Sequence, residues 1–230
     1  NKQKKNNQDN QVGKKVKPKY EMTKNYDVKP IGDADPKVVL LTIDDAPDEH
    51  AVEMAKTLKK MHVKAIFFIM GTFLKSEKGK EKLKKIHDMG FMVGNHTVTH
   101  PTLSEISKKK QREEIVPVYK EIKEITGEPA KFFRAPHGMN TDVSAQLAKE
   151  RGVLPMNWSY GYDWHQQYED PKALTDIMLK PDPPGLLHNG AILLMHDRAW
   201  TAKALPDIVK GLREKGYKFV DPAEIKTSKA

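Results

Sequence analysis

The chain has 230 residues and carries 40 Lys and Arg residues against 31 Asp and Glu residues, a formal net charge of +9. It contains no cysteine, which excludes disulfides, thiolate metal sites and cysteine nucleophiles, and which suits an exported protein. Because no run of about 18 apolar residues is present, we expect no transmembrane helix. The basic residues form no arginine-rich or aromatic-interleaved patch, so we expect no nucleic-acid partner.

The first twenty residues, NKQKKNNQDNQVGKKVKPKY, are rich in Lys, Asn and Gln, with valine as their one apolar type before the final tyrosine. Such a segment cannot bury a core. We therefore expect residues 1–36 to be a basic flexible amino-terminal tether, with ordered structure starting near Pro36. Residues 37–226 should form one folded domain, followed by a short tail at 227–230.

From residue 38 onward, short apolar runs alternate with segments of helical periodicity. The expected strands are residues 38–44, 64–70, 91–94, 131–134, 153–158, 191–196 and 217–220. The expected helices are residues 50–61, 80–90, 104–127, 142–152, 171–179 and 204–216. Since no glycine-rich phosphate loop follows the first strand, this alternation predicts an α/β fold, a (β/α) barrel with about seven parallel strands and helices outside.

Polar side chains follow five of the expected strands, at the point where each strand ends or soon after it. They are Asp44 and Asp45, then His96 and His100, then Arg134 and His137, then Asp163 and Trp164, and last His196. In barrels of this kind the chemistry lies at the carboxyl ends of the strands. The sequence therefore predicts that these side chains share one rim.

His96 and His100 lie four residues apart, so on a helical turn both imidazoles would point at one spot. With one carboxylate of the Asp44–Asp45 pair they form a two-histidine, one-carboxylate metal site with open positions. The second aspartate can then accept a proton from metal-bound water. Taken singly, the aspartate pair also suits a turn or a helix cap, and the histidines also suit a solvent-exposed turn.

The remaining polar groups suit proton transfer. Arg134 can pair with the aspartate that acts as base and keep it ionised. His196 can protonate a leaving group, and Asp163 can orient and charge that imidazole.

Five ordered segments resemble the motifs of the polysaccharide deacetylases, the NodB-type homology domain of carbohydrate esterase family four. They are TIDDAP (42–47), NHTVTH (95–100), RAPHG (134–138), DW (163–164) and LMH (194–196), and KAIFFIMG (64–71) is similar to the family's second strand. The resemblance covers residues 37–226 as a catalytic domain. It implies a distorted (β/α) barrel and metal-dependent hydrolysis of N-acetyl groups on N-acetylglucosamine-type polymers, such as peptidoglycan or chitin-like oligomers, with release of acetate.

Position by position, the resemblance implies that Asp44 is the general base and that Asp45, His96 and His100 hold one divalent metal ion. Arg134 then tethers Asp44. Zinc is the expected ion, and cobalt, iron and nickel also suit two nitrogen ligands and one oxygen ligand.

The resemblance also implies that His196 is the general acid and that Asp163 tunes it. The backbone N–H of His137 would help to stabilise the oxyanion. Trp164 and Leu194 would wall the pocket for the acetyl methyl group.

Two positions depart from the family's pattern. Ala46 stands where the family usually has glycine, and it is expected to add a methyl group near the base and either to narrow the site or to shift the loop. His137 stands where the family usually has an aromatic residue such as tyrosine, a mild change if only the backbone N–H takes part.

Three alternatives stay open. A glycan-binding relative that keeps the metal but has lost turnover is favoured by Ala46 and opposed by the intact Asp44 and His196. A non-haem iron oxygenase uses the same ligand types, but normally in a β-sandwich barrel rather than in alternating strands and helices. A basic nucleic-acid binder would lose affinity steeply with salt.

The expected partners are an N-acetylated glycan substrate and, through the basic tail, an anionic cell wall or membrane surface. We expect a monomer that is exported to the cell envelope or the extracellular space.

Overall fold

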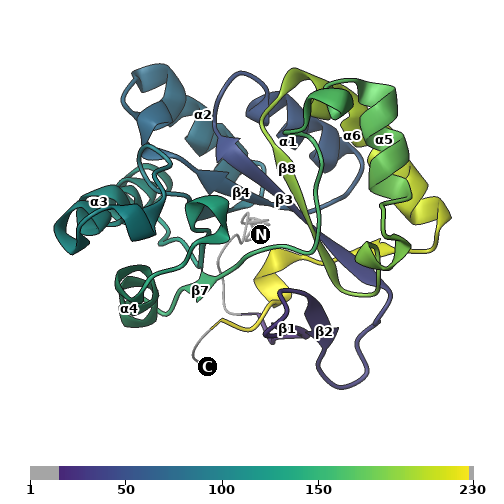
Figure 1. The fold of residues 1–230 in the computed structure, drawn as a ribbon, viewed down its shortest axis with the longest axis horizontal. Helices are drawn as coiled ribbons and strands as arrows, with labels where there is room; N and C mark the ends of the chain where they lie inside the picture. Colours follow the sequence, from purple (N-terminus) through teal and green to yellow (C-terminus); the bar gives the residue numbers. More distant parts are fainter. Residues whose placement is uncertain (1–15, 228–230) are drawn as a thin grey trace, which may run out of the picture.

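The computed structural model describes residues 16–227, in which a parallel sheet is ringed by helices (Figure 1). The strands follow the order β7-β6-β5-β4-β3-β8, and β9 pairs with the start of β3. These strands are β3 (Val38–Ala46), β4 (Ile66–Ile69), β5 (Met92–Asn95), β6 (Phe132–Phe133), β7 (Leu154–Pro155), β8 (Ala191–His196) and β9 (Lys218–Phe219). The expected α/β barrel of about seven parallel strands is therefore confirmed.

Six α-helices cover the outside of this sheet within residues 16–227. They are α1 (Ala51–Lys60), α2 (Glu77–Asp88), α3 (Lys108–Thr126), α4 (Asp142–Glu150), α5 (Pro171–Leu179) and α6 (Ala199–Glu214). Short 3₁₀ turns lie at Gly71–Leu74, Leu103–Glu105, Pro136–Gly138, Gln166–Tyr168, Pro184–Leu186 and Pro222–Glu224. None of the helices in this range is long and apolar enough to cross a membrane.

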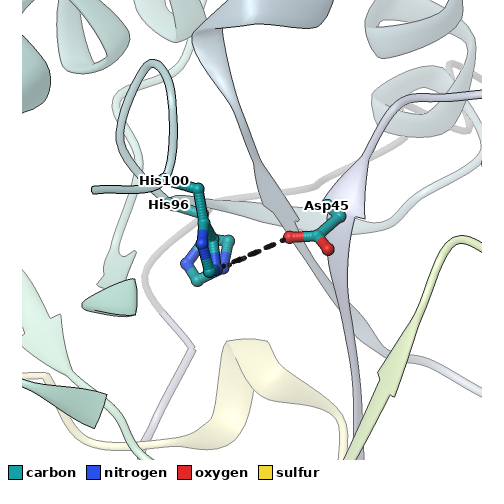
Figure 2. Close-up of side chains that lie close together, drawn as sticks. All are labelled: Asp45, His96 and His100. Carbon is teal, nitrogen blue, oxygen red and sulfur yellow. Dashed lines mark ion pairs between the residues drawn. The ribbon is translucent and has the colours of Figure 1, made fainter. Parts of the chain in front are cut away.

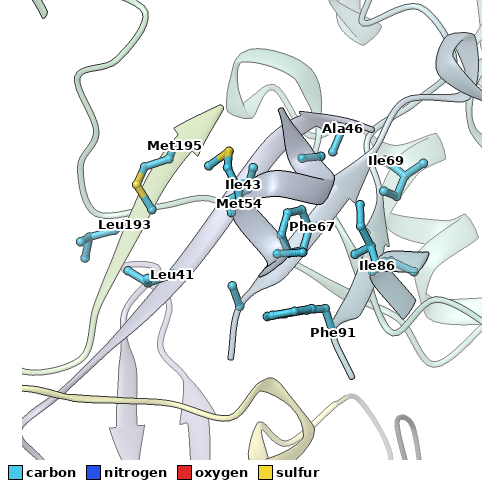
Figure 3. Packing of buried hydrophobic residues seen from close by; sticks show 14 of the residues in the cluster. Leu41, Ile43, Ala46, Met54, Phe67, Ile69, Ile86, Phe91, Leu193 and Met195 are labelled. Atoms are coloured by element: carbon cyan, nitrogen blue, oxygen red, sulfur yellow. The ribbon is translucent and has the colours of Figure 1, made fainter. Parts of the chain in front are cut away.

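The central strand β3 is buried along almost its whole length, because its apolar run packs on both faces of the sheet. Leu41 and Ile43 belong to the cluster between sheet and helices, which Figure 3 shows around Phe67 and Met195. Leu40 belongs to a second cluster, on the side that the strands enclose. This period-two alternation decides which side chains at the end of β3 reach the rim of the barrel.

The segment expected to be a tether is structured over residues 16–36, and its first 15 residues lie outside the described residues. Strands β1 (Tyr20–Met22) and β2 (Val28–Pro30) form an antiparallel hairpin. Tyr20 and Val28 are buried in the enclosed cluster, and the Val28 N–H donates to the carbonyl of Gly190 at 2.8 Å. The expectation that order begins near Pro36 is therefore wrong, because a few apolar anchors in a polar segment suffice to dock it on the domain.

Several other boundaries differ from the sequence prediction, among them those of α3, α6 and β7. The long helix α3 starts at Lys108 after a 3₁₀ turn, and α6 starts at Ala199 rather than at residue 204. The expected strand at 153–158 shortens to β7, because the carbonyls of Met156 and Asn157 accept hydrogen bonds from Arg134 instead of continuing a ladder.

Candidate metal centre and active site

The expected site residues gather at the carboxyl ends of the strands, where β3 and β8 lie side by side. Asp44 and His196 occupy paired positions on these two strands. On β8, Leu193 and Met195 pack toward the helices, so the alternation turns His196 to the enclosed side, as it does Asp44 on β3. A carboxylate and an imidazole thus face the same space from neighbouring strands.

Asp45 would point away from Asp44 if β3 continued as a regular strand. Instead Asp45 has a φ of 59°, and the pairing of β3 with β4 shifts register between Ile43 and Ala46. Aspartate tolerates this left-handed conformation better than most other residues. As a result Oδ2 of Asp44 and Oδ1 of Asp45 both lie 3.5 Å from Nε2 of His96.

The loop that carries the histidine pair is held in shape by α3. The Glu114 carboxylate accepts hydrogen bonds from the N–H groups of Val98 (3.0 Å) and Thr99 (2.8 Å) and from the Thr99 hydroxyl (2.5 Å). Thr97 and His100 have positive φ values of 69° and 63°, so the segment that joins the histidines is an irregular loop and not a helical turn. The two imidazoles converge through this loop rather than through the helical turn expected from their spacing.

Asp45, His96 and His100 form a compact cluster in which one ligand atom of each lies within 4.8 Å of the others (Figure 2). Oδ1 of Asp45 lies 3.5 Å from Nε2 of His96 and 3.9 Å from Nε2 of His100. Ligand atoms about 2.1 Å from a tetrahedral zinc ion would lie about 3.4 Å apart. Oδ1 of Asp45 and Nε2 of His96 are buried without a hydrogen-bond partner in residues 16–227, so a divalent ion fits these atoms.

Hydrogen bonds and nearby charges fix the orientation or shift the pKa of these three candidate ligands. Nδ1 of His96 donates to the carbonyl of Arg134 at 2.6 Å, which leaves the Nε2 lone pair for a metal. Burial lowers the pKa of His100, and the charge of the neighbouring His96 lowers it further, so the neutral form of His100 is favoured. Burial raises the pKa of Asp45, but the proximity of His96 and the charge of His196 outweigh it and hold the pKa well below its usual range.

Arg134 is fully buried and holds Asp44 in one orientation. Its Nη1 donates to Oδ1 of Asp44 at 2.9 Å and to the hydroxyl of Thr42 at 2.7 Å. Its Nε and Nη2 donate to the carbonyls of Met156 (3.0 Å) and Asn157 (2.9 Å). Asp44 is itself almost fully buried, so Asp44 and Arg134 form a buried salt bridge next to the cluster.

His196 is oriented by Asp163. Its Nδ1 donates to Oδ1 of Asp163 at 2.6 Å, while its own backbone N–H and the Thr201 hydroxyl donate to Oδ2, each at 2.7 Å. Burial lowers the pKa of His196, but the carboxylates of Asp163, Asp44 and Asp45, with Asp163 contributing most among them, together raise it by more, so the pKa lies above its ordinary value. The imidazole can therefore hold its proton to higher pH than a free imidazole and exchange it at Nε2.

Trp164 and Leu194 lie beside this imidazole. The Trp164 ring, 46% exposed, is centred 5.5 Å from the His196 ring. A Cβ on Gly161 would lie 2.9 Å from the Trp164 ring and 3.0 Å from Cβ of Leu194. The glycine therefore lets an aromatic and an aliphatic side chain approach each other next to His196.

The two positions that depart from the family's pattern behave differently. Ala46 is buried in the helix-side cluster with Met54 and Ile69 (Figure 3), so its methyl group does not narrow the site as expected. His137 is exposed at the rim with a φ of 59°, and its ring centre lies 4.9 Å from that of His100.

An open groove of about 480 Å³ begins at Asp45 and leads away from the cluster. It is lined by Asp45, Asp48, Glu49, His50, Met70, Phe73, Asp197, Arg198, Ala199 and Trp200.

Three residues with close contacts around the site had no role assigned to them from the sequence: Glu114, Asp197 and Arg198. The Asp197 carboxylate accepts hydrogen bonds from the N–H groups of Asp48 (2.6 Å), His50 (2.7 Å) and Ala51 (3.0 Å), which fixes the loop after β3. Nη2 of Arg198 donates to Oδ2 of Asp45 at 3.2 Å. The position of Asp197 and Arg198 directly after His196 was the available signal.

Known proteins with similar sequences and structures show to which class this chain, with its parallel barrel and its cluster at the rim, belongs. A sequence profile described as polysaccharide deacetylase matches residues 31–156, and the chain belongs to this family. The peptidoglycan-N-acetylglucosamine deacetylase of Bacillus cereus is 31% identical over 199 residues, 83% of this chain and 69% of that protein.

Two further similar proteins are a peptidoglycan deacetylase and a pseudoenzyme of carbohydrate esterase family four. The peptidoglycan-N-acetylmuramic acid deacetylase PdaA of Bacillus subtilis is 29% identical over 203 residues, 86% of this chain and 74% of that protein. The solved structure of a CE4 family pseudoenzyme from Bacillus anthracis aligns with a TM-score of 0.72 at 29% identity, over 84% of this chain and 67% of that one. The family resemblance drawn from the motifs is therefore confirmed.

The geometry predicts that His100→Ala abolishes stoichiometric metal binding, because it removes one of three ligands. Elemental analysis of the full chain after loading with Zn²⁺ and desalting measures this. His188→Ala is the matched control, since His188 contacts Asp27 and the Leu186 carbonyl near the start of β8 and should leave binding intact. One retained equivalent of metal in His100→Ala would rule out this ligand set.

Proposed function

We propose that this protein is a metal-dependent N-deacetylase that hydrolyses N-acetyl groups on N-acetylglucosamine-type residues of a polymer and releases acetate. One observation carries the proposal. The ligand atoms of Asp45, His96 and His100 converge on one point, and that point is flanked by a carboxylate, Asp44, and an imidazole, His196. Such an arrangement provides a base and an acid on either side of a polarised carbonyl.

Peptidoglycan is the substrate that we favour over chitin-like oligomers. Relatives that match more than four-fifths of this chain are named as peptidoglycan deacetylases. The open groove beside Asp45 gives a long polymer room to run past the site. We also infer a location in the cell envelope or outside the cell, where that polymer lies, with residues 37–226 together with the docked hairpin as the catalytic domain.

The metal would be held by Asp45, His96 and His100, a donor set that suits zinc and also cobalt, iron or nickel. A divalent ion held there supplies polarisation of the acetyl carbonyl and lowers the pKa of a water molecule toward about 7.

The protein's own side chains then move two protons. Asp44, held as a carboxylate by Arg134, accepts a proton as water adds to the acetyl carbon. His196, charged through its pairing with Asp163, donates its proton to the departing nitrogen as the carbon–nitrogen bond breaks. The products are acetate and the free amine of the sugar. Because the amine is a poor leaving group, acid and base are both needed.

The remaining site residues would stabilise the oxyanion and shape the pocket for the acetyl group. The backbone N–H of His137 would donate to the oxyanion of the tetrahedral intermediate, a function in which its side chain takes no part. Trp164 and Leu194 would enclose the acetyl methyl group, since their apolar surfaces lie next to the proposed acid.

A second candidate is a relative that binds metal and glycan without turnover. The similarity to a pseudoenzyme of the same family favours it. The described contacts of Asp44, Arg134, Asp163 and His196 argue against it, because the base and the acid each keep the partner that sets their charge.

The proposal predicts that the Zn²⁺-loaded chain releases acetate from peptidoglycan glycan strands, measured by an enzyme-coupled acetate assay with chitooligomers in parallel. Asp44→Asn and His196→Ala should each lower the rate about 10²- to 10⁴-fold, the usual contribution of a positioned proton transfer. His188→Ala should leave the rate unchanged. Absence of acetate from both polymers with every candidate metal would favour the inactive relative, and near-normal turnover in Asp44→Asn or His196→Ala would refute the mechanism.

The pH dependence should follow the pKa of His196. Because Asp163 raises this pKa, His196 stays protonated to higher pH, and activity falls on the alkaline side as that proton is lost. Asp163→Asn removes the stabilising charge and should move the alkaline limb of the pH–rate profile to lower pH, with metal content unchanged. Thr201→Val removes one hydrogen bond to Asp163 but keeps its charge, and should shift the limb less. An alkaline limb that does not move in Asp163→Asn would contradict this assignment.

A further inference from the structure

The two aspartates at the end of β3 share one pattern: each directs one oxygen toward the histidine pair and the other toward an arginine. Oδ2 of Asp44 faces His96, and Oδ1 of Asp44 accepts a hydrogen bond from Arg134. Asp45 repeats the arrangement with a different arginine. Its Oδ1 faces the histidines, and its Oδ2 accepts a hydrogen bond from Nη2 of Arg198 at 3.2 Å.

We propose that Arg198 is a positioning residue for the metal site: it holds Oδ2 of Asp45 so that Oδ1 alone is presented to the ion. The inference rests on the proposed function, because it needs a divalent ion at Asp45, His96 and His100. Arg198 touches neither the histidines nor the reacting atoms in this account, and it acts only through Asp45.

Arg198 is itself held in place, which distinguishes this contact from an ordinary surface ion pair. Its Nη1 donates to the carbonyl of Asp197 at 2.9 Å. The Asp197 carboxylate in turn binds three backbone N–H groups in the loop that follows Asp45. The two segments that carry Asp45 and Arg198 are thus tied together independently of their own ion pair. Exposed pairs on separate flexible side chains lack such support and contribute little.

The orientation of Asp45 needs this support because the terminal torsion of an aspartate side chain is soft and broadly populated. A carboxylate without a second partner can turn, and it can present both oxygens to one ion. Oδ1 of Asp45 makes no hydrogen bond within the described chain that would fix it. Groups that hydrogen-bond to a metal ligand typically change metal affinity about 10- to 100-fold when they are removed.

Charge and orientation make opposite predictions for Arg198. A guanidinium near a divalent cation repels it, so if charge alone mattered, loss of Arg198 would strengthen metal binding. If Arg198 positions Asp45, its loss weakens binding in spite of the removed repulsion. The direction of the change therefore decides between the two.

The test is Zn²⁺ affinity of the full chain, measured by competition with a chromophoric chelator, for wild type and Arg198→Met. We expect the Kd of Arg198→Met to rise about 10- to 100-fold. Arg112→Met, which removes the same charge from an exposed position on α3, should leave the Kd unchanged. Arg198→Lys keeps the positive charge and a hydrogen-bond donor on a flexible side chain, so its Kd should lie between those of wild type and Arg198→Met. If the methionine variant does not fold, the lysine variant takes its place in the test.

A Kd for Arg198→Met that is unchanged or lower would overturn the inference and leave the metal site itself standing. For Arg198→Lys alone, a Kd equal to that of wild type would overturn it. Failure of wild type to bind Zn²⁺ or any other candidate ion would instead remove the proposed function, and the inference with it. The visible absorption of the Co²⁺ form gives a second readout, because a change of Asp45 from one to two bound oxygens alters the coordination number.

Discussion

The buried guanidinium of Arg134 connects the parts of the barrel that make the site. The guanidinium donates hydrogen bonds to Thr42 and Asp44 on β3 and to the carbonyls of Met156 and Asn157. The backbone carbonyl of Arg134 accepts a hydrogen bond from Nδ1 of His96. A charge buried this deeply is tolerated only when it is paired and hydrogen-bonded, and Arg134 makes four hydrogen bonds, one of them to a carboxylate. Removing one partner of such a pair typically costs about 3–5 kcal/mol. Arg134 therefore positions both the proposed base, Asp44, through its side chain and one proposed metal ligand, His96, through its backbone carbonyl.

Unusual backbone conformations are concentrated at the candidate site. Within residues 16–227, six non-glycine residues have positive φ, and four of them are Asp45, Thr97, His100 and His137. Such conformations persist only where surrounding contacts determine them, and they are frequent at functional sites. Here the surrounding contacts are the Glu114 carboxylate under the histidine loop and the hydrogen bonds of Asp197 behind the loop after β3. The site thus combines residues at the ends of regular strands, such as Asp44 and His196, with residues on irregular loops that these contacts fix to the barrel.

This division explains what the sequence could predict. Apolar runs located the strands, and because parallel strands end at one rim, Asp44, Arg134 and His196 could be expected to lie near one another. The histidine pair was assigned to one cluster for the wrong local reason, since an irregular loop with positive φ at Thr97 and His100, and not a helical turn, joins them. Contacts between loops, such as those of Glu114 and Arg198, depend on tertiary structure and have no periodic signal. The direction of the Ala46 methyl group could not be predicted either, because the register shift in β3 turns it into the core.

The most direct test of the account is a metal titration of the chelator-treated full chain with acetate release as the readout. We expect no turnover without metal, a linear rise with added Zn²⁺, and a plateau at one equivalent per chain, because one set of three ligands serves one reaction centre. Undiminished acetate release by the metal-free chain, or a plateau at two or more equivalents, would contradict a single ion at Asp45, His96 and His100 as the centre of the chemistry.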